Sequence, residues 1–161
     1  MNDTARPARE IGLLSVDQLR ELDGLDLFRG MIAGKIPAAP ITATMGLWLR
    51  EAEQGRVVFA GTPERRHYNP IGSVHGGFAA TLLDSAMSCA VHTHLKKGFG
   101  YTTVEFKVNF VRAITDTTGT VFCEGRSIAV GSRIGTAEGR ITDAAGKLYA
   151  HGTTTCLIFP I

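Results

Sequence analysis

The feature that most constrains the fold is one long helical pattern in the middle of the chain. From Gly76 to about Lys96, apolar side chains recur at helical spacing on one face, namely Ala79, Leu82, Leu83, Ala86 and Ala90. A helix of about 20 residues extends about 30 Å. The rest of the chain must therefore fold around a single long helix.

Strand patterns lie on both sides of this helix. Val104–Phe110 alternates apolar and polar residues, which predicts a half-buried strand. The other expected strands are Met45–Glu53, Arg56–Gly61, Val121–Val130, Ile134–Ala144 and Leu148–Phe159. One long helix and one antiparallel sheet of six strands predict a two-layer α+β domain.

The chain of 161 residues divides into an N-terminal part, residues 1–40, and one main domain, residues 41–161. Ser15 and Gln18 have the spacing of a capping box at a helix start. The N-terminal part is expected to hold a tail over residues 1–12, short helices over 16–22 and 25–33, and a loop at Pro37 and Pro40.

Composition excludes several classes of protein. The net charge is only +2 and the basic residues are dispersed, so we expect no nucleic-acid partner. No apolar run approaches the ~20 residues that span a bilayer, so we expect no membrane segment. The N-terminus lacks the apolar stretch of a signal peptide. The cytoplasm is therefore the expected location.

Cysteine and histidine spacing favours neither a disulfide nor a metal. Cys89, Cys123 and Cys156 are widely separated and form no CxxC motif, so buried thiols are expected. His92 and His94 have no carboxylate or cysteine at ligand spacing, so no metal site is expected. The chain also lacks P-loop, GxGxxG and GxSxG motifs, and no cofactor is expected.

Chemistry is expected first at the start of the long helix. The opening amides of a helix have no intrahelical partners and carry the positive end of the dipole. At Gly76 and Gly77 a substrate can approach them closely, and a carbonyl oxygen held there would be stabilised as its negative charge develops. His75 could orient a group there or merely cap the backbone, and Asn69 could fix the loop or help bind the carbonyl.

Asp84 is the second candidate, because aspartate is a poor residue for the middle of a helix. Together with Gly77, Thr81 and Ser88 it forms a stripe of small polar residues, which suits contact with a ligand or another helix. We expect its carboxylate to attack or to activate water. Gly77 and Asp84 lie about 10 Å apart along the helix axis, which favours a site shared between two subunits.

Two further features point to partners. A single helix covers only a strip of a six-stranded sheet, so an exposed edge strand predicts a homo-oligomer, most simply a two-fold dimer. Gly131-Ser132-Arg133-Ile134-Gly135 is a turn with one cation. It could grip a phosphate or be a plain hairpin turn.

The segments Asn69-Pro-Ile-Gly72 and Val74-His-Gly-Gly77, followed by Asp84, resemble the hotdog-fold thioesterases of the phenylacetate-pathway (PaaI-like) type. The resemblance covers about Met45 to the C-terminus. It implies a six-stranded sheet around one central helix, and hydrolysis of an acyl-CoA to a carboxylic acid and CoA. Coenzyme A would then be part of the substrate, and active sites would lie between subunits of a dimer or of a dimer of dimers.

The resemblance also implies roles for single residues. The amide of Gly77 would bind the thioester carbonyl, supported by Asn69 and His75. Asp84 of the facing subunit would act as general base or nucleophile, and the hydroxyl of Thr103 would assist. The turn formed by Val130, Gly131, Ser132 and Arg133 would meet the pantetheine or phosphates of CoA.

Two other functions stay open: an enoyl-CoA hydratase or dehydratase on the same scaffold, and an acyl-CoA-binding module without activity. The former needs a histidine and an acid placed for proton transfer on carbon. The sequence does not fix the acyl group. Phe78, Leu82 and Phe106 either line the acyl pocket or belong to the plain core.

Overall fold

The structure, a computed structural model, describes residues 6–161. Residues 1–5 of the expected tail lie outside the described residues. Three short helices come first, α1 (Val16–Arg20), α2 (Gly24–Ile32) and α3 (Pro40–Met45). The hairpin of β1 (Leu47–Glu53) and β2 (Arg56–Gly61), the 3-10 turn η1 (Arg65–His67) and the long helix α4 (Gly76–His92) follow. The chain ends with β3 (Phe99–Phe110), β4 (Val121–Val130), β5 (Ile134–Asp143) and β6 (Leu148–Pro160).

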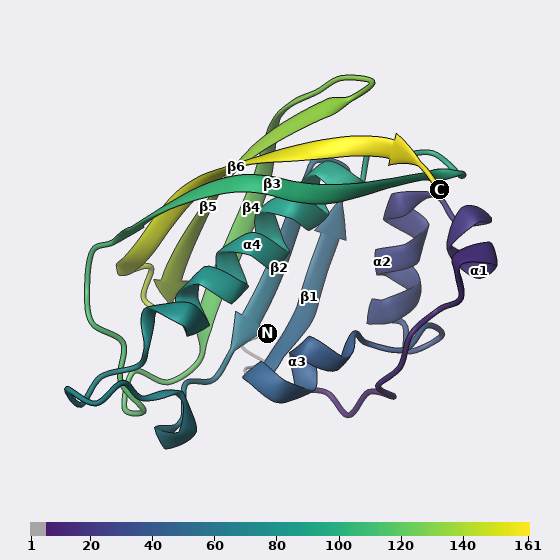
Figure 1. Cartoon of the computed structure of the whole chain (residues 1–161). Coiled ribbons are helices and arrows are strands. Elements are labelled where there is room, and N and C mark those ends of the chain that lie inside the picture. The colour runs from purple at the N-terminus through teal and green to yellow at the C-terminus, as the bar shows by residue number, and fades with distance from the viewer. Residues whose placement is uncertain (1–5) are drawn as a thin grey trace.

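The strands form one antiparallel sheet in the order β1-β2-β4-β5-β6-β3. The sheet curves around α4, which lies against its inner face (Figure 1). The predicted α+β architecture, one long helix and six antiparallel strands, is confirmed.

Close packing of α4 on the sheet depends on glycines in the central strands. A Cβ at Gly125 of β4 would overlap the carbonyl group of Ala86, and one at Gly139 of β5 would lie 2.7 Å from Met87. The helix face that meets these strands is fully apolar, with Leu82, Leu83, Ala86 and Met87 all inaccessible to solvent. Burial of each of the larger side chains contributes about 1.5–3 kcal/mol to the free energy of folding.

Several boundaries differ from the sequence prediction. The helix α4 ends at His92 rather than near Lys96, and β3 begins at Phe99 rather than Val104. The expected loop at Pro40 is wrong, because Pro40 is the first residue of α3, where its missing N–H costs nothing.

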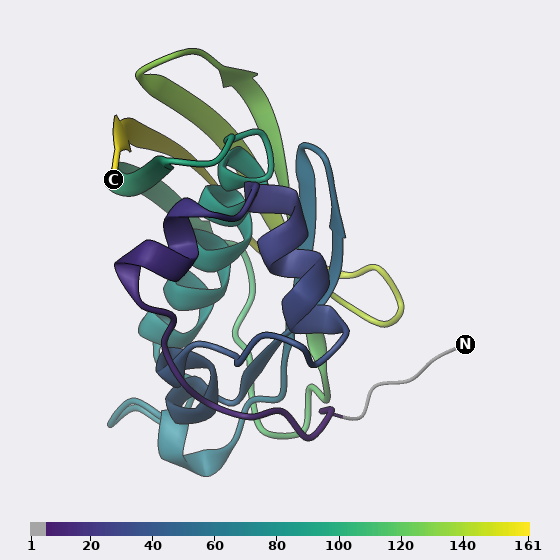
Figure 2. The same cartoon turned by 90° about the vertical axis from the view of Figure 1, so that its right-hand side faces the viewer.

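The N-terminal helices form a layer of their own beside α4. Figure 2 looks onto α1 and α2, with α4 behind them. The capping box at α1 is confirmed, since Ser15 Oγ accepts from Gln18 N at 3.2 Å and Gln18 Oε1 accepts from Ser15 N at 2.9 Å. The start of α2 is tied to the far end of α4, where Gly24 N donates to Leu95 O at 2.9 Å. The division of the chain at residue 40 stays a prediction.

Candidate active site

The loop before α4 is organised by Asn69. Its side-chain Oδ1 accepts from the backbone N–H groups of Ile71 and Ser73, each at 3.1 Å. Its Nδ2 donates to Ser73 Oγ at 3.0 Å. Of its two expected roles, Asn69 therefore performs the first, fixing the loop. A contact with a bound carbonyl stays a prediction.

His75 is the N-cap of α4. Its Nδ1 accepts the backbone N–H of Gly77 at 2.8 Å, so that nitrogen carries no proton in this arrangement. The backbone donor expected to bind a carbonyl thus already has a partner within the chain. A substrate oxygen would have to share this N–H or displace the exposed imidazole.

His67 supports the same loop, a role that no sequence pattern predicted. Its carbonyl accepts from His75 N at 2.7 Å, its Nδ1 accepts from Glu64 N at 3.0 Å, and its ring packs on Phe78. Burial, with the neighbouring Arg66, holds the pKa of His67 below its usual value. The imidazole is therefore a neutral structural group behind the helix start.

Asp84 lies near the middle of α4, half buried, with Thr103 of β3 beside it. Thr103 Oγ1 donates to Asp84 Oδ1 at 2.8 Å. The two side chains are thus joined within one chain, a pairing that the sequence did not predict; the assisting role of Thr103 stays a prediction. One carboxylate oxygen is oriented by this bond, and the carboxyl group borders an open cavity.

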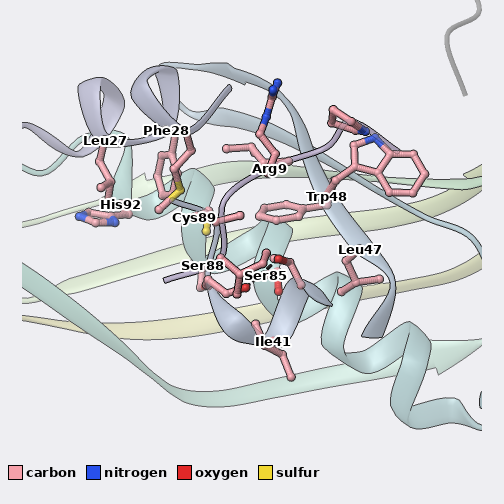
Figure 3. Close-up of a pocket in the computed structure, with 18 of the residues that line it drawn as sticks. Arg9, Leu27, Phe28, Ile41, Leu47, Trp48, Ser85, Ser88, Cys89 and His92 are labelled. Atoms are coloured by element: carbon pink, nitrogen blue, oxygen red, sulfur yellow. Dashed lines mark hydrogen bonds between the residues drawn. The ribbon is translucent and has the colours of Figure 1, made fainter. Parts of the chain in front are cut away.

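That cavity, of about 670 Å³, lies between α4 and the N-terminal helices. Figure 3 shows Leu27 and Phe28 of α2 facing Cys89 and His92 of α4. Four aromatic side chains line it, Phe28, Trp48, Phe59 and Tyr101. Sequence reasoning missed it, because these residues come from four different elements. Phe78 and Leu82 are instead plain core, and Phe106 is partly exposed.

The far end of the cavity holds buried polar groups without charge. Burial lowers the pKa of His92 to about 4, and its ring lies 5.3 Å from that of Phe28 and 4.9 Å from that of Tyr101, centroid to centroid. The Tyr101 hydroxyl is hydrogen-bonded to Ser88 Oγ at 3.2 Å. Burial also raises the pKa of the Cys89 thiol to about 12. This end of the cavity is neutral near pH 7.

The other cysteines, Cys123 and Cys156, are also free and buried, which confirms the expected thiols. Among residues 6–161 no group of three or more His, Cys, Asp or Glu side chains is placed to hold a metal ion. Within that same range no helix is long and apolar enough to cross a membrane.

The turn at Val130 to Arg133 joins β4 and β5 far from Gly77 of the same chain. Gly131 N donates to Ile134 O at 2.8 Å, which closes the hairpin. The adjoining Gly135 packs against Val91, near the end of α4. Along the helix, Val91 lies roughly 20 Å from Gly77. One chain therefore does not bring the turn and the helix start together.

The edge of the sheet at β3 is open in the single chain. Among residues 6–161, β3 pairs only with β6, and no strand lies beside its other edge. Apolar side chains are exposed along this strand and just beyond it, namely Phe99, Val104, Phe106, Phe110 and Val111. An open edge of this kind is a surface for pairing with another chain.

A family model described as the thioesterase superfamily matches residues 71–150, from the loop before α4 to β6. A candidate esterase of Halobacterium salinarum is 33% identical over 84 residues, which cover 51% of this chain and 54% of that protein. The chain thus matches only about half the length of this curated relative.

Solved structures share the fold over most of the chain. A candidate thioesterase of Ralstonia eutropha, described as related to phenylacetic acid degradation, has a TM-score of 0.73 and 25% identity over 81% of this chain and 98% of its own. A Streptococcus mutans protein solved with bound acetyl-CoA has a TM-score of 0.63 and 21% identity, covering 71% of this chain and 89% of its own.

Proposed function

The chain belongs to the thioesterase superfamily and has its hotdog fold, and from that premise we propose that it hydrolyses acyl-CoA thioesters to a carboxylic acid and CoA. The observation that carries the proposal is the carboxylate of Asp84, oriented by Thr103 at 2.8 Å and bordering a cavity of about 670 Å³. A carboxylate in the wall of a largely apolar cavity suits attack on a carbonyl whose apolar part is buried beside it.

In this proposal Asp84 either takes a proton from a water that attacks the thioester carbon, or attacks that carbon itself and forms an anhydride with the acyl group, which water then hydrolyses. In both routes the carbon–sulfur bond breaks and CoA leaves as thiolate. The water supplies the new oxygen of the carboxylic acid and the proton that the thiolate takes up. Thr103 keeps one carboxylate oxygen in place, leaving the other for the reacting group. Stabilising the developing oxyanion is assigned to the amide of Gly77, with His75 releasing or sharing that N–H when substrate binds.

We further propose that each site is shared by two subunits of a homodimer or of a dimer of dimers. Asp84 and Gly77 of one chain lie about 10 Å apart along α4, too far to act on one carbonyl. The open edge of β3, which also carries Thr103, is the surface offered for a two-fold contact. Such a contact would set the Asp84 of one chain against the helix start of its partner.

Coenzyme A enters the proposal as part of the substrate, and no separate cofactor is invoked. The acetyl-CoA in the Streptococcus mutans structure supports a CoA ligand for this fold. We assign the exposed turn at Val130 to Arg133 to contact with CoA, with Arg133 available for a phosphate. The cytoplasmic location stays a prediction.

The test is to incubate the protein with a panel of acyl-CoA and enoyl-CoA compounds and a thiol reagent. Release of free thiol with formation of the carboxylic acid is the expected result. Water addition to an enoyl-CoA without thiol release would overturn the proposal in favour of a hydratase. Binding without turnover of any compound would overturn it in favour of a binding module.

A further inference from the structure

We propose that the cavity beneath the N-terminal helices receives the acyl group, and that residues 6–42 select an uncharged apolar chain much longer than acetyl. This inference rests on the proposed function and adds the substrate class to it. It assigns the first quarter of the chain, which lies outside the residues matched by the superfamily model, to the substrate site.

The position of the cavity gives the direction of the acyl chain. Along α4 its wall is made by one helix face that begins at Asp84, passes Ser88 and ends at His92. From Asp84 to His92 the helix rises about 12 Å. An extended chain advances about 3.6 Å for every three single bonds, so about ten bonds fit alongside. A carbonyl held at Asp84 would therefore direct an acyl chain of roughly this length toward His92.

The residues that line the cavity determine which kind of acyl group can bind there. Phe28, Phe59 and Tyr101 offer aromatic surface, and the buried hydroxyls of Ser88 and Tyr101 are already hydrogen-bonded to each other. A ligand therefore need not supply a polar group at the far end. Bringing a charged group there would cost free energy, since no charged side chain of residues 6–161 lines that end.

The cations of the cavity lie on the N-terminal segment and are tied to its backbone. Arg9 donates to Ile32 O at 2.6 Å, and Arg6 donates to Thr42 O at 3.4 Å. Both bonds join the first described residues to the end of α2 and to α3. The arginines thus hold together the N-terminal segment that lines the cavity.

Other contacts hold the N-terminal segment in place as one wall of the cavity. Gly12 N donates to Ala38 O at 3.0 Å, and Ala38 N donates to Glu10 O at 2.8 Å. At the other end, Gly24 lies so close to α4 that a Cβ there would overlap the carbonyl of His92. More than half of the residues lining the cavity lie before residue 43. The shape of the cavity is therefore set by this segment as much as by the helix.

The first test fills the cavity from the N-terminal side with Ala39→Phe. Ala39 lines the cavity and is half buried. We expect kcat/KM for decanoyl-CoA to fall about tenfold or more, while kcat/KM for acetyl-CoA changes little. The reason is that a difference of one or two carbons in an apolar pocket changes kcat/KM by a factor of this size. The matched control is Ala33→Phe, an exposed position on the same segment that does not line the cavity, which should leave both substrates unaffected.

The second test measures binding without turnover. Trp48 is the single tryptophan of the chain and lines the cavity. S-decyl-CoA, a thioether that cannot be hydrolysed, should change its fluorescence saturably, and S-ethyl-CoA at equal concentration should not. The Ala39→Phe protein should bind S-decyl-CoA about tenfold more weakly. This measurement on the unaltered protein decides the question even if the variant fails to fold.

The outcomes separate this inference from the proposed function. An unchanged ratio of decanoyl-CoA to acetyl-CoA hydrolysis in Ala39→Phe, or equal losses for both, overturns the inference alone. Equal fluorescence responses to the two thioethers also overturn it. Saturable binding of S-decyl-CoA by a protein that hydrolyses no acyl-CoA would instead remove the proposed function and keep the acyl site.

Discussion

The two halves of α4 have opposite surroundings. The first half begins in an exposed loop, where Asn69 and His75 organise the backbone around Gly77. The second half is covered by α2, and Phe28 lies against His92 there. Asp84 lies at the boundary between them. One helix thus has an accessible end that begins in a hydrogen-bonded loop and a covered end rich in aromatic side chains.

One helix can therefore keep the reacting groups apart from the groups that select the substrate. In the proposed function, the open half binds the carbonyl and the CoA part of the substrate. The covered half offers an apolar cavity that water leaves at a gain in free energy when an acyl chain enters. Each variant below therefore tests one half of the helix, or the residue between them, without disturbing the other.

The largest effect is expected at the boundary, from Asp84→Asn. The amide cannot act as base or nucleophile, so hydrolysis of acyl-CoA should fall by about 10²–10⁴-fold, measured as thiol release. Thermal unfolding should change little, because asparagine can still accept from Thr103 Oγ1. Asp17→Asn, at an exposed position on α1, is the matched control. Near-normal turnover in Asp84→Asn would remove the catalytic assignment.

A smaller loss is expected from Thr103→Val, which deletes the hydrogen bond to Asp84 and keeps the side-chain shape. A hydrogen bond to a charged group is worth about 1.5–3 kcal/mol, so kcat/KM should drop about tenfold to a hundredfold. The neighbouring Thr102→Val serves as control, since Thr102 is exposed on the other face of the strand. Equal activity of the two variants would show that Thr103 does not position the carboxylate.

Gly24→Ala should loosen the cover on the second half of the helix. Its Cβ would overlap the carbonyl of His92, so α2 must move away from α4. Overpacking of this kind costs about 1–3 kcal/mol, visible as a lower midpoint of thermal unfolding. Gly12→Ala adds a Cβ that meets only the Pro37 side chain at 3.3 Å and should be tolerated. An undiminished midpoint in Gly24→Ala would contradict the tight contact of α2 with α4.

The smallest effect is a dependence of stability on pH. Burial lowers the pKa of His92 to about 4, below its ordinary 6.5 in the unfolded chain. Between these values the unfolded chain binds a proton that the folded chain does not. The free energy of unfolding should therefore fall by about 1–2 kcal/mol from pH 7 to pH 5.

His92→Phe keeps the ring contacts and should remove this part of the pH dependence, measured by urea unfolding at both pH values. The control His151→Gln changes an exposed histidine and should leave the pH dependence as it was. If the pH dependence of stability is the same in His92→Phe as in the unaltered protein, water reaches His92 freely at the covered end of α4.

Much of the fold could be predicted because its signals are local. The helical spacing of apolar residues in α4 and the alternation of apolar and polar residues in the strands depend only on neighbouring residues. These patterns were sufficient to place the long helix and the strands. The first part of β3 was missed because Gly98 and Gly100 interrupt the apolar pattern there. The helix α3 was missed because Pro40 can begin a helix as well as end one.

The candidate site was predicted less completely, since its parts meet only in three dimensions. Asp84 and Thr103 are 19 residues apart in the chain but share a hydrogen bond. The acyl cavity joins Phe28 of α2 with Trp48 of β1, and no spacing in the sequence links them. The roles expected of Gly77 and of the turn at Val130 to Arg133 depend on a second subunit, so they stay predictions.

The contacts that join the N-terminal helices to α4 affect how such a protein can change its substrate. The carboxylate of Asp84 and the hydroxyl of Thr103 lie within the residues matched by the superfamily model, whereas much of the cavity wall lies before them. Substitutions in α2 or α3 can therefore accumulate without altering the reacting groups. A lineage could acquire new substrates by remodelling one surface layer, and an engineer could do the same by exchanging it.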